Sequence, residues 1–244
     1  AQAVLFGIAA VLVYSLVISP RCRGAKILFA LGVLGLLGAA ILATGSRGGA
    51  LGVVVGLTIA TVTRLSARRT WAIGMVSVLA IGFFLVPRAT VTMARFNRVV
   101  EAGETGARDK LARIGWEMIR ERPLLGWGPR YSEELGARTG RTGPIAAHNW
   151  YLQIGLAFGA IGLVPWLMGL CATFLPMIRL ARSAIGGTCL SIGCLIAVVG
   201  LTSHLGTSKP VWIFLAIAGN IEALTRRPST LAVPASLALR RWGI

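Results

Sequence analysis

Long apolar blocks alternate with short basic connections along most of the chain. Each block is long enough to cross a hydrocarbon core of about 30 Å as a helix. The blocks are too long and too uniformly apolar to be strands of a membrane barrel. The pattern therefore predicts an all-α polytopic membrane protein with about seven transmembrane helices. The predicted spans are residues 3–19, 26–44, 48–63, 71–87, 147–176, 184–204 and 209–225.

One long polar segment, residues 88–146, interrupts the apolar blocks. Within it Leu111, Ile114 and Met118 recur at helical spacing, and Pro123 ends the run. We expect an amphipathic helix here that lies on the outer membrane face. The predicted organisation is a four-span segment (1–87), a large extracytoplasmic loop with an interfacial helix (88–146), a three-span segment (147–225) and a cytoplasmic tail (226–244).

Basic residues gather in the connections on one side of the predicted bundle. Arginine and lysine in short loops mark the cytoplasmic side of a membrane protein. The N-terminus, the Ser46–Arg47 turn, the loop 88–146 and the Thr207–Lys209 turn then lie outside. These anchors explain much of the net charge of +17, so no nucleic-acid partner is predicted. The cytoplasmic anchors are Arg21, Arg23, Lys26, Arg64, Arg68, Arg69, Arg179, Arg182, Arg226 and Arg227.

Composition supports the same class. Only 14% of the residues are charged, whereas a soluble domain has about a quarter. The chain starts at Ala1 and enters a span directly with its N-terminus outside, so we expect it to be the C-terminal part of a longer protein. The cysteines show no metal-ligand spacing, and we predict neither a metal site nor a disulfide. They are Cys22, Cys171, Cys189 and Cys194.

His148 and Asn149 stand where the polar loop passes into a long apolar helix. A titratable group at the edge of a membrane is costly unless it is hydrated, paired or functional. The pair is therefore a candidate functional site. The alternative is structural: a histidine that caps a helix or contacts a lipid head group.

Three segments together resemble the O-antigen ligase and polymerase superfamily of bacterial surface-polysaccharide enzymes. Their order, their loop positions and the predicted topology all match that family. They are TGSRGGALG (44–52), Arg108 followed by ERPLLGWGP (121–129), and AHNWYLQIGLAFGAIGL (147–163). Members usually have about a dozen spans, so the resemblance implies about five further spans before this chain.

The resemblance implies a chemistry at the periplasmic face of the bacterial inner membrane. A glycan passes from undecaprenyl pyrophosphate to a sugar hydroxyl with inversion, without metal or cofactor. The acceptor is lipid A-core for a ligase and another repeat unit for a polymerase. Such a reaction needs a base for the hydroxyl and cations for the departing pyrophosphate.

The resemblance assigns roles to residues of each segment. His148 is the candidate general base or the residue that orients the acceptor. Arg47 and Arg108 are the candidate cations, because a guanidinium fork suits phosphate oxygens. Ser46 and Gly48 are candidate substrate-binding residues of the turn around Arg47. Asn149 is a further one, although capping of the following helix is the favoured role.

Other polar residues have weaker cases. Glu133 and Glu134 could act as bases, but solvated loop charge is the favoured interpretation. His204 and Lys209 flank the last outer turn and could reach a substrate. For the three tryptophans of the loop region, interface anchoring is favoured over sugar stacking. They are Trp116, Trp127 and Trp150.

Three classes of function stay open from the sequence. The first is a lipid-linked glycan transferase, with ligase only slightly ahead of polymerase. The second is a transporter of the bicarbonate type, although no span carries an evident central acid-base relay. The third is an assembly subunit without chemistry. The expected partners are the lipid-linked glycan, its glycan acceptor and membrane lipids.

Overall fold

The computed structural model describes residues 2–18, 24–44, 46–64, 107–203, 205–206 and 208–225. Within these ranges every regular element is helical, which confirms the all-α prediction there. The expected span 71–87, the first part of the loop and the tail 226–244 lie outside the described residues. The elements are α1 (Gln2–Val17), α2 (Ala25–Ala43), α3 (Arg47–Arg64), α5 (Ala107–Glu121), the 3-10 turn η1 (Gly128–Arg130), α6 (Tyr131–Arg138), α7 (Trp150–Arg179), α8 (Ala184–Gly200), α9 (Lys209–Gly219) and α10 (Ile221–Thr225).

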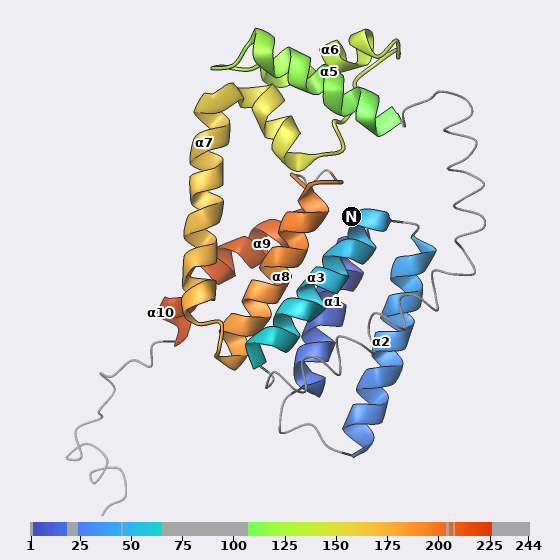
Figure 1. The fold of residues 1–244 in the computed structure, drawn as a ribbon, viewed down its shortest axis with the longest axis vertical. Helices are drawn as coiled ribbons and strands as arrows, with labels where there is room; N and C mark the ends of the chain where they lie inside the picture. Colours follow the sequence, from blue (N-terminus) through green and yellow to red (C-terminus); the bar gives the residue numbers. More distant parts are fainter. Residues whose placement is uncertain are drawn as a thin grey trace, which may run out of the picture.

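The centre of the bundle is the pair formed by α3 and α8, with α1 packed against both (Figure 1). Glycines let these helices approach closely. A Cβ on Gly52 would lie 3.1 Å from the Leu195 carbonyl oxygen, and one on Gly56 would lie 3.1 Å from that of Ser191. Small residues at helix contacts are typical of membrane bundles, where packing rather than water exclusion holds helices together.

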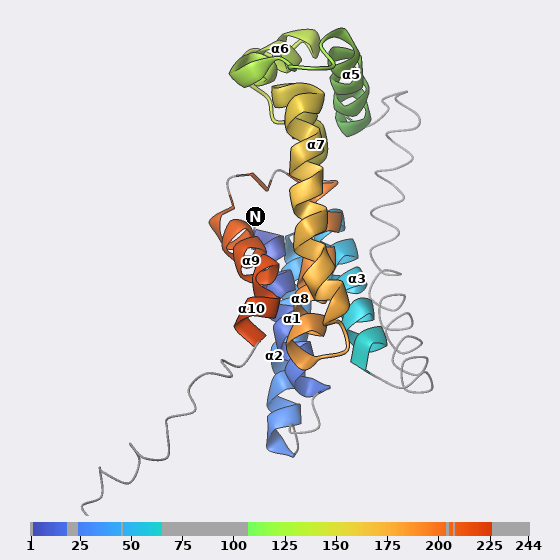
Figure 2. The ribbon, with the colours of Figure 1, turned by 90° about the vertical axis from the view of Figure 1, so that its left-hand side faces the viewer.

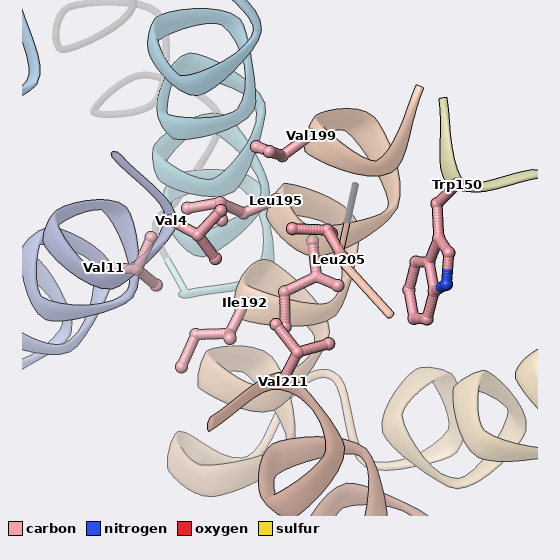
Figure 3. Packing of buried hydrophobic residues seen from close by; sticks show 9 residues of the cluster. Val4, Val11, Trp150, Ile192, Leu195, Val199, Leu205 and Val211 are labelled. Carbon is pink, nitrogen blue, oxygen red and sulfur yellow. The ribbon is translucent and has the colours of Figure 1, made fainter. Parts of the chain in front are cut away.

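The buried apolar core joins both ends of the sequence. Side chains from α1, α8, the turn after α8 and the starts of α7 and α9 pack together (Figure 3). Trp150 is the aromatic member of this core, with 2% of its surface exposed. The buried members are Val4, Val11, Trp150, Ile192, Leu195, Ile196, Val199, Leu205 and Val211.

Only one described helix, α7, is both long and apolar enough to cross a membrane by itself. Five shorter apolar helices accompany it: Gln2–Val17, Ala25–Ile41, Gly48–Thr63, Ala184–Gly200 and Lys209–Gly219. They coincide with predicted spans, but the last predicted span, 209–225, is divided into α9 and α10. Large apolar side chains cover the outside of these helices, including Leu28 and Phe29 of α2, at 73% and 76% exposed. Such a surface is suited to lipid contact.

Helix α7 consists of two segments that meet at Gly159, whose backbone is non-helical (φ 60°, ψ −157°). The first segment, residues 150–158, crosses the end of the bundle, and the second, residues 160–179, runs along its side (Figure 1). The second segment has 20 residues, which is the length of a transmembrane helix. The sequence analysis expected one continuous span over 147–176 with tilt or an extension.

Helices α5 and α6 form a cap at the same end of the bundle (Figure 2). The predicted amphipathic helix is present as α5, but its apolar face is covered by protein rather than lipid. Leu111, Ile114 and Met118 are buried, and they pack in one cluster with Leu135 of α6 and Leu152 of α7. The expectation that this face lies on the membrane is therefore wrong: α6 and α7 supply the apolar partner.

Candidate functional site

His148 lies exposed at the sharp corner between the loop and α7. Its backbone has φ 52°, and it is the positive-φ residue other than glycine among those that the structure describes. The left-handed region is unfavourable for a side chain with a Cβ, and such residues concentrate at functional sites. The corner presents the imidazole away from the packed core and leaves it accessible to a substrate.

The two residues after His148 hold this corner in place. The Asn149 side-chain oxygen accepts a hydrogen bond from the Leu152 backbone N–H at 3.1 Å, so Asn149 caps α7 as the sequence favoured. Trp150 is buried and lies edge-on to Trp166 and Trp212, with ring centroids 4.9 and 5.5 Å apart. His148 is thus exposed but attached to a rigid segment.

The turn before α3, like the corner before α7, is held by a side chain that caps the following helix. The Ser46 hydroxyl accepts a hydrogen bond from the Gly49 backbone N–H at 3.1 Å and caps α3. Arg47 is the first residue of that helix. A Cβ on Gly48 would overlap the side chain of Thr202, so this glycine is required for packing against the end of α8. Ser46 and Gly48 therefore both have structural roles in this turn: Ser46 caps α3, and Gly48 allows the turn to pack against Thr202.

The end of α8 connects the two motifs. On one side, Thr202 packs against Gly48 of the α3 turn. On the other side, a Cβ on Gly200 would lie 3.2 Å from the Tyr151 ring and 3.4 Å from the Trp150 ring. The segments that carry Arg47 and His148 therefore lie at the same end of the bundle, on either side of α8 (Figure 1).

Arg108 belongs to α5, which also lies at this end of the structure (Figure 2). Helix α5 packs on the first segment of α7: a Cβ on Gly115 would lie 2.9 Å from Leu152, and one on Gly155 would lie 3.0 Å from Ile119. Arg108 is in the first turn of α5. All three motifs of the sequence analysis thus belong to segments at one end of the structure, where α5 packs on α7 and α7 packs on α8 (Figure 1).

Two backbone segments interlock at the kink of α7, a feature that the sequence analysis missed. The Trp127 N–H donates to the Leu156 carbonyl at 2.8 Å, and the Ala160 N–H donates to the Pro123 carbonyl at 2.8 Å. The loop 123–128 thereby satisfies backbone groups that the helix break exposes. Gly126 and Gly159 make the approach possible. The sequence contained a signal for this contact, because Gly126 lies in the motif 121–129 and Gly159 lies in the motif 147–163.

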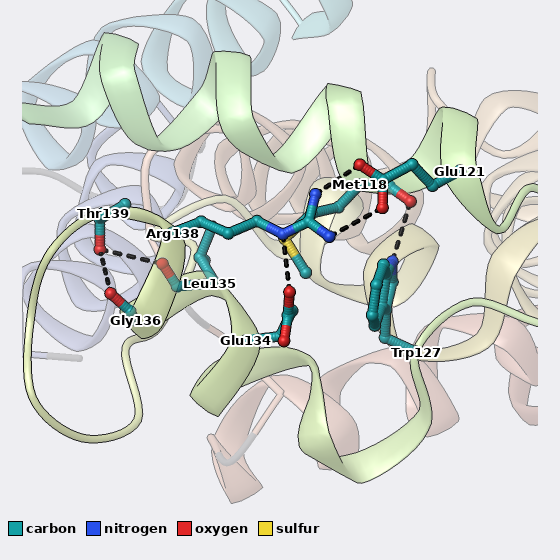
Figure 4. A network of polar contacts seen from close by, with 8 residues as sticks. All are labelled: Met118, Glu121, Trp127, Glu134, Leu135, Gly136, Arg138 and Thr139. Carbon is teal, nitrogen blue, oxygen red and sulfur yellow. Dashed lines mark hydrogen bonds and ion pairs between the residues drawn. The ribbon is translucent and has the colours of Figure 1, made fainter.

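A polar network joins α5 to α6 beneath this loop (Figure 4). The Arg138 guanidinium donates to both carboxylate oxygens of Glu121 at 2.5 and 2.8 Å and to Glu134 at 2.7 Å. The hydrogen bond from Arg138 lowers the pKa of the Glu121 carboxyl. The Trp127 indole N–H donates to the Met118 carbonyl at 2.9 Å. The centroid of the Trp127 ring lies 4.1 Å from the guanidinium carbon of Arg122, a cation–π contact.

This network revises several expectations. Glu134 accepts a hydrogen bond from Arg138, whereas Glu133 is exposed. Trp150 is buried in the protein core, so interface anchoring is wrong for it, whereas Trp127 is half-buried and donates its indole N–H to the Met118 carbonyl. Trp116, at 59% exposed, still fits that role.

The remaining candidates are distributed as follows. His204 lies outside the described residues, and Lys209 is exposed at the start of α9. In the described ranges no three histidine, cysteine or acidic residues gather as metal ligands would. The cysteines placed there, Cys171, Cys189 and Cys194, are free thiols.

A comparison with protein families matches residues 32–167 to the O-antigen ligase family. The match covers more than half of the 244 residues and includes all three motifs. A comparison with curated proteins finds no match. Members of the matched family are glycosyltransferase-like enzymes of the bacterial inner membrane. The chain therefore belongs to the O-antigen ligase family.

Proposed function

We propose that this protein transfers a glycan from undecaprenyl pyrophosphate to a sugar hydroxyl at the periplasmic face of the inner membrane. One observation carries the proposal. The exposed His148 corner, the Arg47 turn and the first turn of α5 with Arg108 belong to elements that lie at one end of the structure (Figure 1). This arrangement matches the demands of glycosyl transfer from a pyrophosphate carrier, namely a base and two cations.

The proposed chemistry is a single displacement. The acceptor oxygen attacks the anomeric carbon of the donor while the bond between that carbon and the phosphate oxygen breaks, and the configuration inverts. His148 accepts the proton of the acceptor hydroxyl, because neutral imidazole is a suitable base near neutral pH. Undecaprenyl pyrophosphate leaves with the bonding electrons. Arg47 and Arg108 stabilise its growing negative charge.

We propose the seven-span arrangement for the same molecule. Lys26 lies in the first turn of α2 and Arg179 is the last residue of α7, and these two helix ends lie opposite the start of α7 (Figure 1). That separation fits a cytoplasmic end rich in arginine and lysine. Several helices have 16 to 19 residues, close to the length that spans a bilayer: α1, α2, α3 and α8.

The transporter alternative gains less support. A carrier of ions or protons uses titratable groups inside its spans. The buried polar residues of the described ranges are Ser15, Thr61 and Ser191, and none of them titrates in the physiological range. A ligase and a polymerase, in contrast, would use the same site.

The test is a lipopolysaccharide gel from a deletion strain of the source bacterium. The full-length gene is returned as wild type, as His148→Ala or as Arg141→Ala, a control at an exposed loop position. Loss of all long-chain bands in His148→Ala, with glycan retained on undecaprenyl pyrophosphate, supports the ligase. Core that carries a single repeat identifies the polymerase instead. A normal ladder in the deletion strain contradicts both.

A further inference from the structure

The loop that follows α5 exposes two adjacent leucines outside the predicted spans. Leu124 and Leu125 are 63% and 73% exposed. Within residues 107–146, Trp116 is the other large apolar side chain with such exposure. Leucines that remain in water forgo the free energy of burial, about 25 cal/mol for each Å² of apolar surface. An exposed apolar pair on a polar segment therefore indicates a surface that contacts an apolar partner.

The backbone of this loop is fastened to the bend of α7. The Pro123 carbonyl accepts a hydrogen bond from the Ala160 N–H at 2.8 Å, and the Leu124 carbonyl accepts one from the Ile161 N–H at 3.2 Å. The loop thus has a fixed place on α7, above the start of its second segment (Figure 1). The two leucine side chains extend from that place at the surface of the protein.

The leucine pair continues the apolar surface of α7. Along the second segment of that helix, exposed apolar side chains recur at intervals of three, four and seven residues, so they lie along one side. Ile161 stands at the start of this row and is the residue whose N–H binds the Leu124 carbonyl. The apolar surface therefore extends from the helix onto the loop. The members of the row are Ile161, Val164, Met168, Leu175 and Ile178.

The length of α7 sets the height of the loop in a membrane. Its second segment covers residues 160–179, and a rise of about 1.5 Å per residue makes it about 30 Å long. This is the thickness of the hydrocarbon core of a bilayer. The loop is hydrogen-bonded to the first two residues of the segment. Leu124 and Leu125 therefore lie at one boundary of the hydrocarbon core when α7 spans the bilayer.

Positive charge accompanies the leucine pair. Arg120 and Arg122 precede it, and both are exposed. The nearby carboxylate of Glu121 forms an ion pair with Arg138, and residues 122–132 include no acidic residue. The boundary of the hydrocarbon core is also the level of the lipid phosphates, with which a guanidinium forms strong hydrogen bonds. The loop therefore combines an apolar tip with cations, as membrane-surface segments do.

We propose that residues 120–125 anchor the cap of α5 and α6 to the membrane surface. Leu124 and Leu125 insert beside the first carbons of the acyl chains, and Arg120 and Arg122 bind the phosphates of anionic phospholipids. Continuity with the apolar surface of α7 favours a bilayer over a protein partner. The inference is independent of the proposed function, because a protein without transferase activity would bind lipid in the same way.

The depth of the loop is measured with a fluorescent probe on the full-length protein in lipid nanodiscs. A bimane label is attached to Leu125→Cys in a background without native cysteines, and Leu124→Cys is the second probe. Each labelled protein must keep the unfolding temperature of its parent. We expect strong quenching by lipids brominated near the head group, weaker quenching by bromine near the chain end, and protection from aqueous iodide.

Two control positions calibrate this measurement. Glu133→Cys, exposed on α6, should be quenched by iodide and not by brominated lipid. Met168→Cys lies about 12 Å further along the second segment of α7 than Ala160 and should respond most to bromine near the chain end. Iodide quenching of both leucine probes to the extent seen at Glu133→Cys would overturn the inference. Protection in native membranes but not in nanodiscs would also overturn it, because a protein would then cover the pair.

The role of the arginines is tested by the identity of the quenching lipid. The nanodiscs contain phosphatidylcholine with a minor fraction of phosphatidylglycerol, and the same amount of bromine is placed on one lipid or the other. The label at position 125 should be quenched at least about twofold more strongly by brominated phosphatidylglycerol, because arginine at the membrane surface attracts anionic lipid. The Arg120→Gln/Arg122→Gln variant should lose this difference.

Lys110→Gln, at an exposed position near the other end of α5, is the matched control and should keep the preference for phosphatidylglycerol. Equal quenching by the two lipids in the parent protein would contradict the contact between the arginines and lipid phosphate. A preference that survives in the double glutamine variant would contradict it as well.

Discussion

Gly126 and Gly159 lie backbone against backbone, so that a Cβ on Gly126 would be 2.6 Å from the Gly159 nitrogen. Both have positive φ, at 67° and 60°. The contact joins the loop after α5 to the kink of α7, and it directs the first segment of α7, with His148 before it, across the end of the bundle. The position of the candidate base therefore depends on two glycines about 33 residues apart in the sequence.

Substitution of either glycine by alanine should be strongly destabilising. The new Cβ would meet backbone atoms, which cannot rotate away, and the conformation is itself unfavourable for alanine. We expect a loss of more than about 2 kcal/mol in the free energy of unfolding for Gly159→Ala. Thermal unfolding of the purified protein in detergent measures this.

The matched control is Gly169→Ala, in the second segment of α7, where a Cβ would have open space around it. It should change stability by less than about 1 kcal/mol. Equal stability of Gly159→Ala and Gly169→Ala would show that the interlock does not hold the kink.

Asn149 should act through its cap. Asn149→Ala removes the acceptor for the Leu152 N–H and should cost about 1 kcal/mol, with a fall in transfer rate because the His148 corner loosens. Asn149→Asp keeps an oxygen at the same position and should retain stability and most activity. If the Asn149→Asp enzyme lost as much activity as the Asn149→Ala enzyme while both proteins folded, a role through the cap would be contradicted and Asn149 would have to contact the substrate.

The Arg138 network should make the cap of α5 and α6 sensitive to acid. Arg138 lowers the pKa of Glu121 below its usual value of 4.5. A lowered folded-state pKa contributes stability above the unfolded pKa, and this contribution is lost as the pH falls through the folded value. We therefore expect stability to be constant down to about pH 5 and to decrease below pH 4.5.

Glu121→Gln should flatten this dependence, as measured by the unfolding temperature between pH 3 and pH 7. Glu117→Gln, at an exposed position on the same helix, should leave the dependence in place. The account of the network fails if the two variants respond to acid in the same way.

The two candidate cations should depend on the shape of the guanidinium as well as on its charge. Arg47→Gln and Arg108→Gln should each lower kcat by about 100-fold or more, and the lysine variants should recover only part of that loss. Steady-state kinetics with lipid-linked donor give these values. Arg113→Gln, exposed on α5, should keep the wild-type rate. A wild-type rate in both glutamine variants would remove the arginines from the mechanism.

The sequence predicted well those features that depend on local pattern. Apolar blocks located α1, α2, α3, α7 and α8 to within a few residues, and helical periodicity with Pro123 located α5. The cap by Asn149 followed from its place at the start of an apolar run.

Features that depend on distant contacts were not predictable in the same way. Amphipathicity shows that one face of α5 needs an apolar partner, but it does not distinguish α7 from lipid. The kink at Gly159 is hidden inside a continuous apolar run, because a single glycine is compatible with a membrane helix. The Arg138–Glu121 pair joins positions 17 residues apart on different helices, beyond any helical spacing.

The most direct test of the central claim is the transfer rate of the full-length enzyme with and without the His148 imidazole. Purified wild type and His148→Ala are compared with lipid-linked donor and acceptor, and their unfolding temperatures are measured in parallel. The account predicts a kcat at least about 100-fold lower in the variant, with unchanged stability and donor KM. A folded His148→Ala enzyme that keeps more than half of the wild-type kcat would contradict it.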